Sequence, residues 1–242
     1  MIHLIQPMGG GGTRFGNKGF NVPKPLIMLQ GRPFFYWAVR SVTKFMEPLD
    51  ITFVVLKDHV ERFNIDDRIK EYFPGAKITV IPEVLPGAVL TCLEGVKSVE
   101  DDMPLLFNDC DHAFVCSDFY DYCMQQEADD GALLTFKSSL DAYSYVKYEN
   151  GRAVGTVEKQ VVSDRAICGA YFFKNRQVFE KYSRSYLDNC SYSEYFVSGV
   201  YNELAADGGS IRVFGLDENI SFGTPDEFDE AEKNTALKDL LD

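Results

Sequence analysis

Short apolar runs and helical apolar patterns alternate along the first part of this chain. Residues 2–8 form an apolar run that ends in four consecutive glycines, which is typical of a buried strand entering a tight loop. Apolar residues then recur at helical intervals from Pro33 to Phe45, where a proline suits the first helical turn. The alternation continues to about residue 115, with further strands predicted at 51–56, 77–81 and 104–107 and helices at 59–72 and 87–99.

Beyond that point the pattern becomes one of short, closely spaced strands. They are predicted at 131–138, 144–149, 153–159 and 166–173, with a hairpin turn at Glu149-Asn150-Gly151. Helices are expected at 177–189, 194–206 and 226–241, and one more strand at 211–214. The two patterns together predict an α/β fold: a Rossmann-like, mixed but mostly parallel sheet flanked by helices, with an antiparallel substrate-binding portion. We expect a single domain over residues 1–242, with its two halves at about 1–125 and about 126–242.

Charge is distributed unevenly along the sequence. The 242 residues carry a formal net charge of −13, which argues against nucleic-acid partners and against binding to anionic membranes. Residues 1–46 nevertheless contain six basic residues and no aspartate or glutamate. This local excess of positive charge suits a small anionic ligand held at one place, although chance clustering on a solvated surface would give the same pattern.

The sequence also indicates where the protein resides. No apolar run approaches the roughly 18–20 residues that span a bilayer. The first residues lack the basic start and long apolar stretch of a signal peptide. The six cysteines form no Cys-x-x-Cys pair and have no histidines at zinc spacing. We therefore expect a cytoplasmic protein with free thiols rather than three disulfides.

The strongest chemical signal follows the first strand. Gly9 to Gly12 precede Thr13 and Arg14, and a Pro-Lys-Pro triplet holds Lys24 between two prolines. Glycine N–H groups at a strand end can form a nest for anions, and an arginine beside it can donate forked hydrogen bonds to phosphate. The pattern is neither a Walker loop, since no Gly-Lys-Ser/Thr follows, nor a dinucleotide-binding GxGxxG, since Arg14-Phe15 would crowd a pyrophosphate. Glycines alone would also suit a surface loop, whereas the added Arg14 and Lys24 favour a triphosphate site.

Gly-Gly-x-Gly-Thr-Arg followed by Pro-Lys-Pro-Leu resembles the signature of the sugar-phosphate nucleotidyltransferases, also called nucleoside-diphosphate-sugar pyrophosphorylases. Further motifs similar to those of that family follow in the expected order over nearly the whole chain. They are Leu85-Pro86-Gly87-Ala88-Val89, Leu105 to His112, Val157-Glu158-Lys159, Gly169 to Phe173 and Gly223 to Glu227. Residues 194–204 resemble a helix of a subgroup often encoded with capsule and surface-polysaccharide genes. The resemblance implies a nucleotidyltransferase (GT-A-like) fold, with a nucleotide-binding half at about 1–125 and an acceptor-binding half at about 126–242.

This resemblance implies a Mg²⁺-dependent transfer of a nucleoside monophosphate from an NTP to a small phosphorylated metabolite, with release of pyrophosphate. Arg14, Lys24 and Lys159 are the implied catalytic residues, because two anions must be brought together. Asp111 is the implied ligand of Mg²⁺. The implied nucleotide-binding residues are Met8, Gly9, Gly10, Gly12, Thr13, Pro86, Gly87, Ala88 and Asp109. The implied acceptor-binding residues are Glu158, Lys159, Gly169 and Glu194.

Several of these residues also have plain structural interpretations. Glu158 and Lys159 form a dipeptide that is common on solvated surfaces, and Asp109 would suit a turn or cap. His112 beside Asp111 is a candidate base, but a phosphate nucleophile is already ionised at neutral pH. Packing is the preferred interpretation of Trp37, Tyr171 and Tyr195.

One position departs from the family pattern. Many members have an aspartate two residues before the glycine of the Gly-Thr-Pro turn, where it completes the metal site, and this chain has Ser221 there. A hydroxyl is a poor replacement for a carboxylate at a magnesium site. Three outcomes are open: Asp109, Asp217 or Glu218 compensates, the metal keeps more water, or catalysis is weak.

Four functions therefore remain open. The first is transfer from CTP or dTTP to a sugar 1-phosphate, and the second is the same chemistry on phosphocholine or another phosphorylated amine or amide. A glycosyltransferase would use Asp109-Cys110-Asp111 as an Asp-x-Asp metal motif, but it requires neither the glycine loop nor Pro-Lys-Pro. Turnover with any acceptor would exclude a non-catalytic nucleotide-binding regulator. The expected partners are an NTP and a small phosphorylated metabolite, with no nucleic acid and no membrane, and a homo-oligomer is left open.

Overall fold

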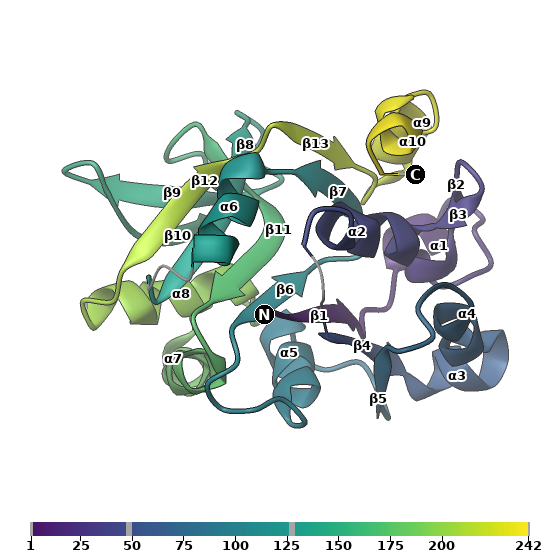
Figure 1. The fold of residues 1–242 in the computed structure, drawn as a ribbon, viewed down its shortest axis with the longest axis horizontal. Helices are drawn as coiled ribbons and strands as arrows, with labels where there is room; N and C mark the ends of the chain where they lie inside the picture. Colours follow the sequence, from purple (N-terminus) through teal and green to yellow (C-terminus); the bar gives the residue numbers. More distant parts are fainter. Residues whose placement is uncertain (1, 47–49, 126–128, 242) are drawn as a thin grey trace.

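A nine-stranded sheet runs through the part of the chain that the computed structural model describes, residues 2–46, 50–125 and 129–241 (Figure 1). Its parallel portion consists of β1 (His3–Met8), β4 (Asp50–Leu56), β5 (Lys77–Ile81) and β6 (Leu105–Asn108). β1 lies between β4 and β6, and β5 follows β4, with every pair parallel. The strand–helix alternation of the sequence therefore produces the parallel sheet that it predicts.

The second half of the chain extends this sheet with mainly antiparallel strands on the side of β6. These strands are β8 (Gly131–Lys137), β9 (Ser144–Glu149), β10 (Arg152–Glu158), β11 (Arg165–Phe173) and β12 (Ile211–Gly215). β11 pairs antiparallel with β6 and so joins the two halves, while β12 is parallel to β8. The predicted hairpin turn links β9 and β10 through Asn150 and Gly151, both at positive φ. The boundary expected near residue 125 adjoins residues 126–128, which lie outside the described residues.

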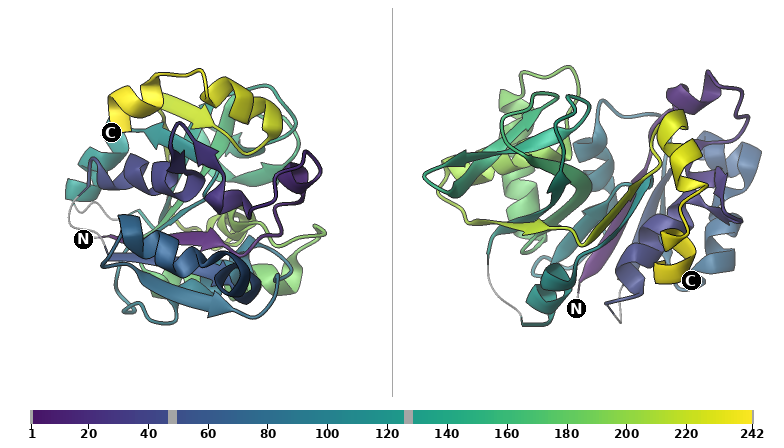
Figure 2. Two further views of the ribbon diagram at one scale, coloured as in Figure 1. Left: turned by 90° about the vertical axis from the view of Figure 1, so that its right-hand side faces the viewer. Right: turned by 90° about the horizontal axis from the view of Figure 1, so that it is seen from above.

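Helices cover both faces of the sheet, as Figure 2 shows. One face carries α2 (Phe34–Thr43), α3 (Lys57–Phe63), α4 (Ile65–Tyr72) and α6 (Ser117–Gln125). The other carries α5 (Ala88–Val96), α7 (Arg176–Asn189) and α8 (Val197–Ala206). Because successive side chains of a strand point to opposite faces, Leu4 is buried in the first of these cores and Ile5 in the second. The mixed α/β fold expected from the sequence is confirmed.

The C-terminal segment returns to the N-terminal half (Figures 1 and 2). It contains β13 (Glu218–Ser221), α9 (Pro225–Ala231) and α10 (Ala236–Leu241). β13 pairs with β7 (His112–Val115) outside the main sheet. The 3-10 helix η1 (Lys24–Leu26) precedes a short hairpin of β2 (Met28–Leu29) and β3 (Arg32–Pro33). A third core packs Phe222 against Phe34 and Phe15, and thereby fixes α1 (Thr13–Gly16) at the end of the glycine loop.

Two helices expected from the sequence are each divided in the structure. The helix predicted over 59–72 is interrupted at Asn64, whose φ of 50° lies in the left-handed region that asparagine tolerates. The single helix predicted over 226–241 is wrong, because α9 ends at Ala231. The Gln30 side chain donates to the carbonyl oxygens of Ala231 and Asn234, at 2.7 Å each, and so satisfies groups that a continuous helix would use. The helix expected from residue 194 begins at Val197.

All six cysteines are free thiols, as expected from the sequence. Within the described ranges, no helix combines the length and the apolar character needed to cross a membrane.

Candidate active site

A cavity of about 610 Å³ opens where β1 and β6 end. β1 leads into the glycine loop and β6 into residues 109–111, and the carboxyl ends of neighbouring parallel strands meet at one edge of a sheet. Most residues that the sequence predicts for the nucleotide and the metal line this cavity, together with Glu194 from the predicted acceptor set. They are Met8, Gly9, Gly10, Gly12, Arg14, Lys24, Pro86, Gly87, Ala88, Asp109 and Asp111. Thr13 begins α1, and its side chain lies outside the described part of the structure.

Lys24 and Asp111 contact each other in this cavity. Lys24 begins η1 between Pro23 and Pro25, and its Nζ donates a short hydrogen bond to Asp111 Oδ2. Burial is the largest single effect and opposes the ionisation of both groups, but their mutual attraction and the neighbouring charges and hydrogen bonds together outweigh it. The pKa of Lys24 is therefore raised and the pKa of Asp111 is lowered. The two side chains form an ionised pair at neutral pH.

Asp109 lies in the same cavity, two residues before Asp111. Burial and the Asp111 carboxylate raise the pKa of Asp109, while the Lys24 ammonium acts in the opposite direction. The Asp109 N–H donates to the carbonyl oxygen of Gly169 on β11 at 2.9 Å. Gly169 is not among the residues that line the cavity, so the structure places it behind Asp109. Its acceptor-binding role stays a prediction.

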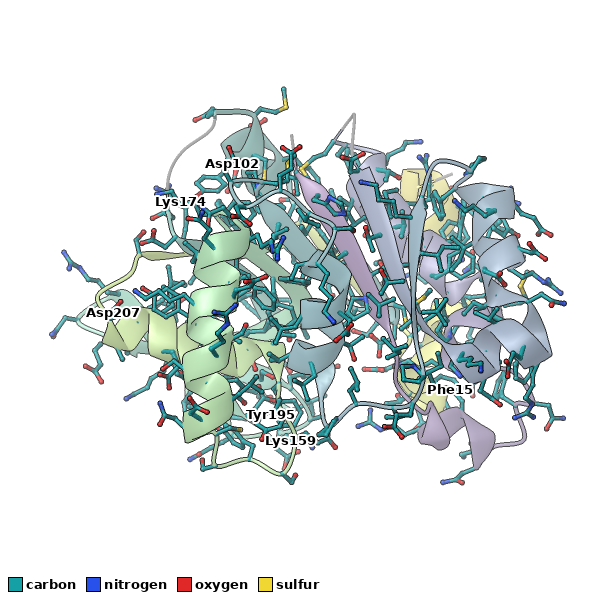
Figure 3. All side chains as sticks on the ribbon, turned by 90° about the horizontal axis from the view of Figure 1, so that it is seen from below. Phe15, Asp102, Lys159, Lys174, Tyr195 and Asp207 are labelled. Atoms are coloured by element: carbon teal, nitrogen blue, oxygen red, sulfur yellow. The ribbon has the colours of Figure 1, made fainter. Side chains whose placement is uncertain are left out.

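The predicted nucleobase loop is joined to the second half of the chain by main-chain contacts. The N–H of Tyr195 donates to the carbonyl of Pro86 at 3.2 Å, and the N–H of Val89 donates to the carbonyl of Tyr195 at 3.1 Å. Gly87 has a φ of 140°, and a Cβ at this position would lie 2.4 Å from the Tyr195 nitrogen. Glycine is therefore required where the loop crosses this segment. The next residue, Phe196, lies within reach of Lys159, which is labelled with Tyr195 in Figure 3, so the same segment also reaches the predicted acceptor residues.

The predicted acceptor residues Glu158 and Lys159 lie at the end of β10. The Nζ of Lys159 is 5.6 Å from the centroid of the Phe196 ring, close enough for a cation–π contact. The Ser198 hydroxyl donates a short hydrogen bond to Glu158 Oε1. Neither acceptor residue lines the cavity itself, but Phe196 does. The structure thus brings both residues to the border of the cavity rather than into it.

His112 does not have the surroundings of a catalytic base. Its exposed fraction is 3%, and it does not line the cavity. Among the described residues neither ring nitrogen has a hydrogen-bond partner, and burial lowers the pKa of His112 to about 4. The imidazole is therefore neutral and separated from the cavity, which agrees with a reaction that needs no base.

Ser221 pairs with His112 in the ladder of β13 and β7, next to the predicted metal-binding segment. Asp217 and Glu218 lie at the other end of β13, roughly 10 Å along the strand. Neither can therefore replace a carboxylate at position 221. Of the three compensating residues considered from the sequence, only Asp109 lies in the cavity.

Asp109 and Asp111 therefore give the cavity two carboxylates, which are hard oxygen donors. The described residues contain no group of three or more His, Cys, Asp or Glu side chains placed to hold a metal ion. Mg²⁺ commonly takes one or two protein carboxylates and completes its shell with water and substrate phosphates. This donor set fits Mg²⁺ that binds together with a phosphorylated ligand, rather than an ion held by the protein alone.

Some contacts around the cavity have no signal in the sequence. The Tyr143 hydroxyl donates to Glu227 Oε1 at 2.8 Å, although the two residues are 84 positions apart. The capping box of Thr224 and Glu227 at the start of α9 can be identified from the local sequence. The partners that these residues find across the fold cannot, and the same holds for Phe196 beneath Lys159.

Comparison with known proteins places this geometry in a family. Residues 8–183 match the MobA-like NTP transferase domain. No curated protein matches the chain. The structure is similar to the nucleoside-diphosphate-sugar pyrophosphorylase from Vibrio cholerae RC9, with a TM-score of 0.82 and 22% identity over 96% of this chain and 100% of the other.

Two further solved structures share the fold. The inositol-1-phosphate CTP transferase from T. maritima has a TM-score of 0.78 and 15% identity, over 100% of this chain and 98% of the other. A candidate glucose-1-phosphate thymidylyltransferase from Bacillus anthracis has a TM-score of 0.76 and 17% identity, over 96% of this chain and 94% of the other. The family match and the cavity at the glycine loop agree, and the chain belongs to the MobA-like NTP transferase family and is a nucleotidyltransferase.

Proposed function

We propose that this nucleotidyltransferase transfers a nucleoside monophosphate from CTP or dTTP to a sugar 1-phosphate and releases pyrophosphate. The observation that carries the proposal is the cavity in which Arg14, Lys24 and the glycine loop lie opposite two carboxylates. Transfer between two anions requires positive charge to neutralise them, and this cavity places the Lys24 ammonium beside Asp111, the proposed metal ligand. The printed names of the structural relatives, which include a CTP transferase and a thymidylyltransferase, support these two nucleotides.

The residues in and around the cavity have different roles in this reaction. Arg14 and Lys24 bind the triphosphate, and the main chain of the glycine loop supplies N–H donors to its oxygens. An oxygen of the acceptor phosphate bonds to the α-phosphorus, and the bond from that phosphorus to the bridging oxygen breaks as pyrophosphate leaves with the electron pair. Lys159 screens the charge of the acceptor phosphate, while Glu158 accepts hydrogen bonds from acceptor hydroxyls. Mg²⁺, held by Asp111 with Asp109, would withdraw charge from the α-phosphate and orient it.

The contact between Lys24 and Asp111 has a consequence for substrate binding. Both groups are ionised and neutralise each other without substrate. A triphosphate that arrives with its metal offers each group a new partner of opposite charge, so the pair separates without leaving a buried charge alone. We therefore propose that nucleotide and Mg²⁺ bind together rather than separately.

A phosphorylated amine such as phosphocholine is a second candidate acceptor. Glu194 lines the cavity beside Phe196, and its carboxylate has no ion-pair partner among the described residues. A carboxylate next to an aromatic ring suits a cationic group. This arrangement favours a cationic acceptor, because a neutral sugar would gain only hydrogen bonds from Glu194.

We place the reaction in the cytoplasm, in a pathway that builds capsule or other surface polysaccharide. The six free thiols support a reducing compartment. The surface-polysaccharide setting is supported only by the resemblance of residues 194–204 to a helix of that subgroup.

Pyrophosphate release with Mg²⁺ tests the proposed function. The panel pairs CTP, dTTP, UTP, GTP and ATP with sugar 1-phosphates, phosphocholine and other small phosphoesters. We expect release to need one NTP and one acceptor, and to fall about 100-fold in Lys24→Ala. Lys57→Ala is the matched control, because Lys57 is 61% exposed on α3. Tight NTP binding without release from any acceptor would contradict the proposed transfer, and no NTP binding at all would remove the nucleotide site as well.

A further inference from the structure

Tyr143, in the connection between β8 and β9, holds the main chain of the predicted acceptor lysine. The N–H of Lys159 donates to the Tyr143 carbonyl at 3.0 Å. Lys159 has a φ of 52°, in the left-handed region that a lysine adopts only when its surroundings impose it. The connection that contains Tyr143 is therefore part of what sets the position of Lys159.

The side chain of Tyr143 extends to the C-terminal segment, which packs on the N-terminal half of the protein. Its hydroxyl donates to Glu227 Oε1 at 2.8 Å. Glu227 Oε2 in turn accepts from the N–H of Thr224 at 2.9 Å, and the Thr224 hydroxyl accepts from the N–H of Glu227 at 3.3 Å. Both carboxylate oxygens of Glu227 are thus hydrogen-bonded within the protein.

The turn beside this capping box contacts the predicted metal ligand. The N–H of Phe222 donates to the Asp111 carbonyl at 2.9 Å. A Cβ at Gly223 would lie 2.4 Å from Asp111 Oδ2, so the main chain of the turn lies directly against the carboxylate. One series of contacts therefore runs from Lys159 through Tyr143 and Glu227 to Asp111.

We propose that Tyr143 and Glu227 form a latch between the two halves, which positions the acceptor residue Lys159 relative to the metal ligand Asp111. Both are positioning residues, because neither lines the cavity. This inference rests on the proposed function for the roles of Lys159 and Asp111. Within that function, the latch sets the separation between the acceptor phosphate and the metal-bound nucleotide.

Packing on each side keeps the latch in one geometry. The Tyr143 ring meets Phe136 edge to face at 5.0 Å between centroids. On the other side, Phe228 follows Glu227 and packs against Phe20 at 5.6 Å, in the core that also holds the glycine-loop helix. Burial and the Glu227 carboxylate raise the pKa of Tyr143 to about 12, against a hydrogen bond from Ser221 that lowers it. The hydroxyl therefore remains a donor throughout the neutral range.

Hydrogen exchange of the Lys159 amide in Tyr143→Phe tests the latch without any substrate. The substitution leaves the Tyr143 carbonyl in place, so the amide loses protection only if the side-chain contact holds the connection. We expect its exchange rate to rise at least fivefold in Tyr143→Phe and in Glu227→Ala. Tyr148→Phe, with Tyr148 38% exposed on β9, and Thr224→Ala, which weakens the capping box alone, are the controls that stay near the wild-type rate. Unchanged exchange in Tyr143→Phe would overturn the latch.

Steady-state kinetics then test what the latch does. With the acceptor that the pyrophosphate panel identifies, we expect Tyr143→Phe to raise the KM for the acceptor at least fivefold, with NTP affinity by calorimetry within twofold of the wild type. Equal losses in acceptor and NTP binding would instead indicate a general structural role and overturn the positioning role. If the wild-type protein transfers nothing, the proposed function fails, and the exchange comparison still decides whether the latch exists.

Discussion

Asp111 has two close contacts: an ion pair with Lys24 and close packing against Gly223. The pair keeps the carboxylate ionised although it lies in a largely buried setting. Because Gly223 has no side chain, the Asp111 carboxylate can keep its observed orientation. The proposed role of Asp111 as a metal ligand therefore depends on its neighbours as much as on its own chemistry.

Asp111→Asn tests the metal role directly. The amide removes the charge that attracts Mg²⁺ while keeping the shape of the side chain, so we expect the Mg²⁺ concentration for half-maximal activity to rise at least about tenfold. A titration of pyrophosphate release against Mg²⁺ measures this. Asp58→Asn, at an exposed position of α3, is the control. An unaltered metal requirement in Asp111→Asn would show that the metal is held elsewhere.

Gly223→Ala tests the packing against the carboxylate. The added Cβ would lie 2.4 Å from Asp111 Oδ2, so the carboxylate must move, and we expect kcat/KM to fall about 10- to 100-fold. In Gly75→Ala the new Cβ meets no atom within 4 Å, so this variant controls for the loss of glycine itself. Wild-type kinetics in Gly223→Ala would mean that the orientation of Asp111 does not limit the reaction.

At the scale of elements, the sequence predicts the strands and helices that obey a simple period. β1, β4, β5 and β6 are short, mainly apolar segments, and their pairing follows from the short crossovers between them. β7 and β13 escape prediction because each is specified by its partner across the fold. The break after α9 likewise depends on Gln30, about 200 positions away. Local pattern therefore predicts the scaffold, while contacts between distant segments decide the remainder.

The same distinction applies to the candidate site. The glycine loop, Lys24 and Asp111 can be identified from the sequence because each lies in a short local motif. Tyr143 cannot, because its importance lies in a carbonyl and a hydroxyl that reach Lys159 and Glu227 only in the folded chain.

The junction of β1 and β4 contains a buried group that links stability to pH. His3 Nε2 lies 2.7 Å from the Thr52 hydroxyl, and burial lowers the pKa of His3 to about 4 from its usual 6.5. The folded protein therefore resists protonation that the unfolded chain accepts below pH 6.5. Stability from neutral His3 is complete above that pH and is lost as the pH falls toward 4.

Urea unfolding at pH 7 and pH 4 measures this effect. We expect the free energy of unfolding to fall by about 2 kcal/mol more in the wild type than in His3→Gln, which cannot be protonated. Carboxylates titrate in both proteins, so the difference isolates His3. Equal decreases in the two proteins would show that His3 is protonated to the same extent in both states.

At the scale of the whole molecule, the two halves meet across the cavity through main-chain contacts as well as through side chains. The predicted nucleobase loop and the segment around Tyr195 are joined by two hydrogen bonds, with Gly87 between them. A loop from one half is thus held by the other. The shape of the nucleotide site therefore depends on how the halves are packed.

Gly87→Ala tests this dependence. The Cβ would collide with the Tyr195 main chain at 2.4 Å, so we expect NTP affinity by calorimetry to fall about tenfold or more. Gly208→Ala carries the same kind of positive-φ strain, with no atom within 4 Å of its new Cβ, and so controls for strain alone. Equal NTP affinity in the two variants would argue against a role for the contact between the halves.

The fate of labelled phosphate tests the central claim most directly. The protein is incubated with Mg²⁺, the acceptor and either α- or γ-labelled NTP, and the products are separated. We expect the α label in the nucleotidylated acceptor and the γ label in pyrophosphate, with both products formed about 100-fold more slowly in Lys24→Ala. A γ label on the acceptor would mean phosphoryl transfer, and an α label that leaves the NTP without reaching the acceptor would mean hydrolysis; either result would contradict nucleotidyl transfer at this cavity.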